Sequence, residues 1–187
     1  MLTINDAIAA VQWAKLSANG GTYMLGTGDY NTPIDGQYDC AGFAINRCWH
    51  IKRHRPEFNR GPWATIEDDI NCNSAIEDAH HKQELFEPLT RPELGALLLY
   101  PTIYLKGHPP FIGHVGIVTA VPAEWDPTVS RWAELGIVQC HGPNGRKPGI
   151  VATDGSVWDH HDSLWPKPEH RSQLVIVKRN LWGTENG

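Results

Sequence analysis

One cysteine and one histidine, far apart in the chain, place the strongest constraint on how it can fold. Cys40 opens a run in which mainly apolar residues recur at three- and four-residue steps as far as Ile51, which predicts a helix that begins at the cysteine. His114 opens a segment of apolar and small residues, 114–120, which is typical of a strand buried on both faces. If the two residues act together, the fold must bring the start of that helix to the edge of that strand.

The two residue types fit a thiolate nucleophile and its base. A free thiol has a pKa of about 8.5 and is mostly protonated at neutral pH. The unpaired N–H groups of a helix start favour the anion, and a histidine within hydrogen-bond reach can take the proton. The backbone N–H of Cys40 would then serve as an oxyanion donor. The sequence therefore predicts a cysteine hydrolase, with Cys40 as nucleophile and His114 as base.

The segments around both residues resemble the NlpC family of bacterial cell-wall peptidases. Residues 39–43, Asp-Cys-Ala-Gly-Phe, are similar to its Asp-Cys-Ser-Gly-Phe/Leu motif, and residues 113–118, Gly-His-Val-Gly-Ile-Val, are similar to its His-Val-Gly-Ile. Residues 23–28, Tyr-Met-Leu-Gly-Thr-Gly, look like its Tyr-x-x-Gly-Gly segment. Residues 138–141, Val-Gln-Cys-His, look like the strand that ends in its third catalytic polar residue.

This resemblance covers roughly residues 5–50 and 94–145, and it implies a papain-like fold and a set of site residues. His141 would be the third catalytic residue and would orient His114, although Gln139 or His161 in contact with that ring would take over the role. Tyr23 and Asp39 would face the substrate, with Asp39 meeting a free amine. The implied substrate is the stem peptide of peptidoglycan, with the bond between D-glutamate and the diamino acid as the favoured cut.

Three features depart from the family pattern. Ala41 replaces the usual serine after the nucleophile, and Gly95-Ala96 stands where the family often has Gly-Asp. The spacing between nucleophile and base, 114 − 40 = 74 residues, is longer than in the family. We place the extra length in an insertion at about 52–92, with a helix near 66–79, that acts as a cleft wall, a lid or a neutral surface excursion. Trp63, inside this insertion, is the tryptophan that we expect to contact the substrate.

The expected architecture is α+β, with N-terminal helices packed on a mostly antiparallel sheet of about five or six strands. The first helix should carry its apolar face on Ile4, Ile8, Val11 and Ala14. Strands are expected at 96–101, 113–121, 135–141, 149–153 and 173–179. A chain of 187 residues, 41% of them apolar, suits one catalytic domain over 1–183 with a tail at 184–187.

Composition argues against two classes of partner. The net charge is −5 and the 16 Lys and Arg residues are scattered, which is unsuited to nucleic acid. The sequence contains no run of 18 apolar residues of the kind that spans a membrane. We expect a monomer. No export signal is visible, so the protein should be made in the cytoplasm and reach the wall after phage lysis or by injection or secretion.

The remaining cysteines and histidines are expected to play structural roles. Cys48, Cys72 and Cys140 form no Cys-x-x-Cys pair and are odd in number, which favours buried free thiols. His141 can face a cleft only if Cys140 faces the core, since neighbours on a strand alternate. The pairs His50/His54, His80/His81 and His160/His161 could offer metal ligands, but the first lacks the glutamate of a zinc peptidase. We expect no metal and no cofactor.

Other functions remain open. The same cysteine and histidine would serve an N-acetylmuramoyl-L-alanine amidase of the related CHAP type, or an acyltransferase that acts on a non-wall amide. A non-catalytic binding module could keep the same fold. The presence of all three polar positions counts against the binding module.

Overall fold

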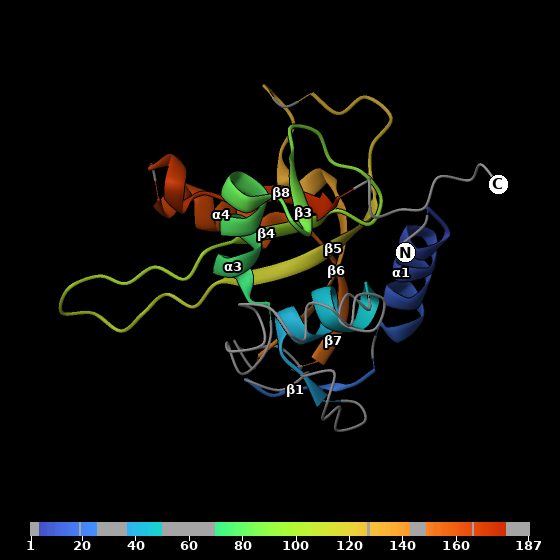
Figure 1. Cartoon of the computed structure of the whole chain (residues 1–187), viewed down its shortest axis with the longest axis horizontal. Coiled ribbons are helices and arrows are strands. Elements are labelled where there is room, and N and C mark those ends of the chain that lie inside the picture. Colours follow the sequence, from blue (N-terminus) through green and yellow to red (C-terminus); the bar gives the residue numbers. More distant parts are fainter. Residues whose placement is uncertain are drawn as a thin grey trace.

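Six antiparallel strands form the central sheet of the computed structural model (Figure 1), which describes residues 4–18, 20–25, 37–49, 70–126, 128–142, 149–165 and 167–178. The strand order is β3-β8-β4-β5-β6-β7. Their bounds are β3 (Phe86–Leu89), β4 (Leu97–Tyr100), β5 (His114–Ala120), β6 (Gly136–His141), β7 (Gly149–Asp154) and β8 (Gln173–Val177). The five expected strands are all present, and the mixed class with a mainly antiparallel sheet is confirmed.

The sheet also has an edge strand that the sequence analysis missed. β3 pairs only with β8, and Pro88 lies opposite Val175. Proline has no N–H to donate to a ladder and is tolerated at a sheet edge, but it obscures the strand signal in the sequence. A second, two-stranded parallel sheet joins β1 (Thr22–Tyr23) to β2 (Gln37–Tyr38) just before Cys40.

Two helices cover one face of the large sheet. These are α1 (Ile4–Ser17) and η1 (Gly42–Cys48), a helix of the π type, which contact each other and β5. Val11 and Ala14 of α1 are buried as expected, but Ile8 is 50% exposed and Ala7 and Ala10 are buried in its place. The expected face was therefore wrong by part of a turn, because small alanine side chains let α1 approach its neighbours closely.

The opposite face of the sheet is covered by α4 (Ser156–Leu164), which the sequence analysis did not predict. Its Trp158 is fully buried in a cluster with Val118 and Ile137. Gly116 makes this packing possible, since a Cβ there would lie 2.9 Å from the Trp158 ring and 2.5 Å from Ile137. The described residues also form two short 3₁₀ helices, η5 (Trp132–Glu134) and η6 (Pro168–His170).

The described part of the expected insertion belongs to the core. It contains α3 (Cys72–Glu77) and η4 (Asp78–Lys82), and Asn71 caps α3 through a hydrogen bond of 3.0 Å from the Ser74 N–H. The Asp78 carboxylate is fully buried and accepts three backbone N–H groups, from Glu84, Leu85 and Phe86. The segment 70–92 is thus no surface excursion, while 52–69, with Trp63, lies outside the described residues.

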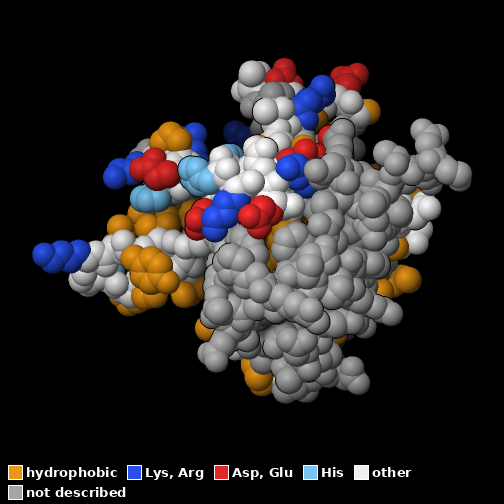
Figure 2. All heavy atoms as spheres, viewed as in Figure 1, with side chains coloured by type: hydrophobic (Ala, Val, Ile, Leu, Met, Phe, Trp, Pro, Cys, Tyr) orange, Lys and Arg blue, Asp and Glu red, His pale blue; other side chains and the backbone are white. Residues whose placement is uncertain are grey.

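A long arm, residues 101–113, joins β4 to β5 and extends away from the sheet (Figure 1). It carries exposed apolar side chains, as Figure 2 shows, among them Tyr104 and Ile112. At its root the Gly113 N–H donates to Thr102 Oγ1 at 2.8 Å, which fixes the approach to His114. Among the described helices, none is long and apolar enough to cross a membrane.

Candidate active site

Cys40 lies at the start of the helix that continues into η1. Asp39 caps this helix: its Oδ1 accepts the Gly42 N–H at 2.7 Å, and its carbonyl accepts the Phe43 N–H at 3.1 Å. An N–H in the first turn has no acceptor within the helix, so the amide of Cys40 is available to an external anion. Cys40 is only 7% exposed, and its Sγ lies 3.9 Å from the Gly113 carbonyl oxygen.

His114, the first residue of β5, follows Gly113, whose carbonyl oxygen lies near Cys40 Sγ, and its interaction with the Cys40 side chain acts to raise the pKa of His114. The fold thus brings the start of the helix to the edge of the strand, which is the juxtaposition that the sequence analysis requires. The Val115 N–H also acts to lower the pKa of Cys40. Both contacts supply positive or donor groups to the sulfur, which favours the thiolate.

Gln139, and not His141, holds the other side of the His114 ring. Gln139 Oε1 lies 2.5 Å from His114 Nε2, and Gln139 is 2% exposed. The ring of His141 instead meets the Gly142 carbonyl through Nδ1 at 2.7 Å. Residues 139 and 141 lie on the same face of β6, so strand alternation does not distinguish them. Gln139 lies opposite Gly116 in the β5–β6 ladder, and its amide reaches the His114 ring from there. The expectation that His141 orients His114 was therefore wrong.

Aromatic rings support His114 from the α4 side of the sheet. The Trp158 ring lies 5.4 Å from the His114 ring at an interplanar angle of 29°, and Tyr100 lies 6.0 Å away. Trp158 is fully buried, so this contact fixes the plane of the imidazole and keeps water from its inner face. An indole face at this distance also favours a positively charged ring.

The electrostatics of the pair favour a thiolate and an imidazolium. The pKa of Cys40 is well below its usual value because the Cys72 side chain hydrogen-bonds to it, with further help from His114 and the Val115 N–H, against the opposing effect of burial. For His114, burial lowers the pKa, but the Cys40 thiolate and the Gln139 amide outweigh it and the net pKa is raised. Both shifts favour the form of the pair in which the proton is on the ring and the sulfur is a thiolate.

Cys72 is a close neighbour of the nucleophile that the sequence analysis treated as an inert thiol. Its pKa is well above the usual value because of its hydrogen bond to Cys40 and its burial, so Cys72 stays protonated and donates to the Cys40 thiolate. No sequence spacing signals this contact, because Cys72 reaches Cys40 from α3, in the part of the chain assigned to an insertion.

The other two thiols are structural. Cys140 is fully buried, and its Sγ lies 3.3 Å from the Tyr38 carbonyl oxygen. Burial raises the pKa of Cys140 to about 12. Cys48 is also buried, and all four cysteines are free thiols, as predicted for three of them. With Cys140 in the core, His141 faces the cleft, which confirms the expected alternation.

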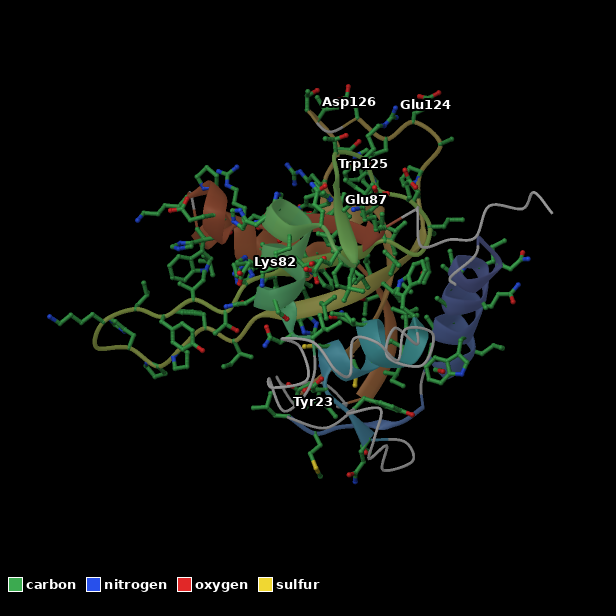
Figure 3. The ribbon with its side chains drawn as sticks, in the orientation of Figure 1. Tyr23, Lys82, Glu87, Glu124, Trp125 and Asp126 are labelled. Carbon is green, nitrogen blue, oxygen red and sulfur yellow. The ribbon has the colours of Figure 1, made fainter. Side chains whose placement is uncertain are left out.

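A cleft of about 510 Å³ opens beside His114, while the buried Cys40 is not among its described lining residues. Its described lining consists of Tyr23, Leu25, Tyr100, Ile112, Gly113, His114, Gln139, His141, Gly142 and Val157. Tyr23 lies at the opposite end of the molecule from the loop of Glu124 and Trp125 (Figure 3), and its ring packs where a Cβ on Gly142 would be 3.1 Å away. Burial and the nearby Cys40 and Asp39 charges raise the pKa of Tyr23, so its phenol stays a hydrogen-bond donor.

The structure places the residues expected to contact the substrate in different surroundings. Tyr23 lines the cleft, as the resemblance implies. Asp39 is 9% exposed, and its carboxylate caps the nucleophile's helix, so its observed contact is structural. The described part of the insertion, 70–92, contributes Cys72 to the site but none of the described cleft-lining residues. Trp63 lies outside the described residues.

The described residues contain no group of three His, Cys, Asp or Glu side chains suited to a metal ion. His80 instead meets Gln173, and His161 stacks on Tyr100 with ring centroids 3.8 Å apart. The pair His50/His54 lies outside the described residues.

The site therefore offers a thiol beside an imidazole, a buried amide on the other side of that ring, and a helix-start N–H. No protein-family model, curated protein or solved structure matches this chain.

Proposed function

We propose that this chain is a cysteine hydrolase that cleaves an amide bond with Cys40 as nucleophile, His114 as base and Gln139 as orienting residue. One observation carries the proposal. Cys40 begins a helix beside His114, its interaction with that ring acts to raise the pKa of His114, and Nε2 of the ring is held by the buried Gln139 amide. Nucleophile, base and orienter in one connected chain are the geometric signature of nucleophilic catalysis.

The reaction follows from the positions of these groups. The Cys40 thiolate attacks the substrate carbonyl, and the negative charge that develops on oxygen meets the helix-start N–H of Cys40. His114 donates its proton to the leaving amine, which releases the first product and leaves a thioester on the sulfur. His114 then takes a proton from water as the water attacks the thioester, and the second product leaves with the thiolate restored. Gln139 keeps the ring aimed at the sulfur throughout.

The favoured substrate is the stem peptide of peptidoglycan, cut between D-glutamate and the diamino acid. The support is the resemblance of residues 39–43 and 113–118 to the NlpC motifs, together with the position of the Cys40 helix start against an antiparallel sheet. Tyr23, at the position that the resemblance assigns to the substrate cleft, lines the observed cleft. The tyrosine and histidine side chains in that lining can hydrogen-bond peptide groups on either side of the scissile bond.

Digestion of defined muropeptides tests this proposal. The reduced protein is incubated with purified muropeptides and the fragments are weighed by mass spectrometry. Cys40→Ala should abolish cleavage, while Cys48→Ala, which removes a buried thiol from the same helix, should retain it.

The fragments identify the bond. Release of a fragment that ends in L-alanyl-D-glutamate supports the endopeptidase, and a lactoyl sugar with an intact stem would assign an amidase instead. Absence of cleavage by the reduced wild type would contradict the wall substrate. Cleavage by Cys40→Ala would contradict the nucleophile.

A further inference from the structure

The Gln139 amide has two ends of the same shape, and the site works with only one of the two orientations. With Oε1 toward His114, the amide accepts a proton from Nε2, so Nδ1 is the nitrogen that remains for Cys40. A half-turn of the amide would point an N–H at Nε2. That orientation disfavours a proton on Nε2 and weakens both the imidazolium and the tautomer that the base needs. Something in the structure has to select the orientation.

Thr153 of β7 makes this selection possible. Gln139 Nε2 donates to Thr153 Oγ1 at 2.9 Å, and Thr153 Oγ1 donates its own hydrogen to the Asp154 carbonyl at 2.9 Å. A hydroxyl has a single hydrogen to donate, so toward Gln139 it can act only as an acceptor. The threonine therefore requires an N–H from Gln139, and the oxygen of the amide must face His114.

The position of Thr153 in the sheet allows this contact. β6 and β7 pair Ile137 with Thr153 and Gln139 with Val151, so Gln139 and Thr153 are diagonal neighbours on one face. Diagonal pairs in an antiparallel ladder lie within reach of a long side chain. Among the described strands, β7 pairs with β6 alone, and Thr153 is half-buried, so Thr153 lies at the outer boundary of the described active-site network.

We propose that Thr153 is a positioning residue, which fixes the orientation of the Gln139 amide and thereby the protonation pattern of His114. The proposal rests on the proposed function, because it assigns the network to the base of a cysteine hydrolase. Thr153 touches neither substrate nor sulfur, and it acts through Gln139. The hydrogen bonds all run in one direction: the His114 ring donates to the Gln139 amide oxygen, the Gln139 N–H donates to the Thr153 hydroxyl, and that hydroxyl donates to the Asp154 carbonyl.

A threonine on a strand also has a merely structural interpretation, since a β-branched side chain suits a sheet edge. Valine has nearly the same shape and strand preference but no hydroxyl. Thr153→Val therefore keeps the packing and removes the constraint on the amide, while Thr153→Ser keeps the hydroxyl and removes a methyl group. The two variants separate the two interpretations, and Thr153→Ala replaces Thr153→Val if the latter does not fold.

The experiment is a pH titration of the His114 ring by NMR on the full chain labelled with ¹⁵N-histidine, with turnover measured in parallel. We expect Thr153→Val to move the deprotonation of His114 to lower pH by about one unit and to reduce turnover about tenfold, the cost of one weakened hydrogen bond to a charged group. Thr153→Ser should behave as the wild type in both measurements.

The outcomes are distinguishable from those of the proposed function. A folded Thr153→Val protein, or a folded Thr153→Ala protein in its place, in which His114 titrates as in the wild type would overturn the role of Thr153 even if the enzyme cuts muropeptides. If the wild type cuts no amide but Thr153→Val still shifts the His114 titration, the proposed function fails and the positioning role stands. A Thr153→Ser protein in which the His114 titration is shifted as in Thr153→Val would also contradict the proposal.

Discussion

Replacement of Gln139 by leucine should slow the reaction without loosening substrate binding. Leucine fills a similar volume in the sheet but offers His114 Nε2 no acceptor. In the folded protein this acceptor lies 2.5 Å from the ring and is 2% exposed, so water cannot readily replace it. The imidazolium would lose its partner in every state of the reaction.

The size of the effect follows from the kind of hydrogen bond. A hydrogen bond to a charged group contributes about 1.5–3 kcal/mol, and each 1.4 kcal/mol is about tenfold in rate. We therefore expect Gln139→Leu to lower kcat about 10- to 150-fold. KM should change little, because the ring faces the sulfur on its other side. The assay is steady-state hydrolysis of the best muropeptide, with thermal unfolding as the check on folding.

His141→Ala is the matched control, because His141 lies on the same strand and face and lines the cleft without an observed contact to the His114 ring. It should alter KM more than kcat. A Gln139→Leu enzyme with the kcat of the wild type would refute the assignment. The reasoning would be equally wrong if His141→Ala had the larger effect on kcat.

Three further predictions concern the surroundings of the pair. Asp39→Ala should destabilise the protein by about 1–2 kcal/mol in chemical denaturation while Asp39→Asn, which keeps a capping oxygen, should not; a raised KM in Asp39→Asn without loss of stability would instead support contact with a substrate amine. Cys72→Ala should raise the pKa of Cys40. A lowered thiol pKa stabilises the folded protein fully above the ordinary thiol pKa, and this stabilisation is lost as pH falls through the lowered value. The Cys72→Ala variant should therefore lose this stabilisation at a higher pH than the wild type. Unfolding curves that match the wild type at every pH would argue against the contact between Cys72 and Cys40. Asp78→Ala leaves three backbone N–H groups without their acceptor and should cost about 3 kcal/mol or more, whereas a loss below about 1 kcal/mol would show that water replaces the carboxylate.

The sequence predicted those parts of the fold that depend on local pattern. The apolar runs at 97–100 and 114–120 are strands because each is buried on both faces, and the five expected strands lie where the pattern placed them. β3 was missed because Pro88 breaks the pattern. α4 was missed because its buried positions, Trp158 and His161, are few among polar residues.

The candidate site shows the same division. The pairing of Cys40 with His114 was predictable, since a helix start and a strand edge each have a local signal. The choice of Gln139 over His141 was not, because both share one face and the decision depends on side-chain length and on the position of Thr153. The contact between Cys72 and Cys40 depends on how α3 docks, and it has no local signal at all.

The central claim is that Cys72, His114 and the Val115 N–H together lower the pKa of Cys40 and favour its thiolate. The most direct test is the rate of alkylation of each cysteine by iodoacetamide as a function of pH, followed by mass spectrometry on the folded protein. The account predicts that Cys40 reacts well before Cys48, Cys72 and Cys140, that its rate stays high below the ordinary thiol pKa of about 8.5, and that His114→Ala abolishes this advantage. Equal labelling of all four thiols, or a Cys40 rate that rises only near pH 8.5, would contradict it.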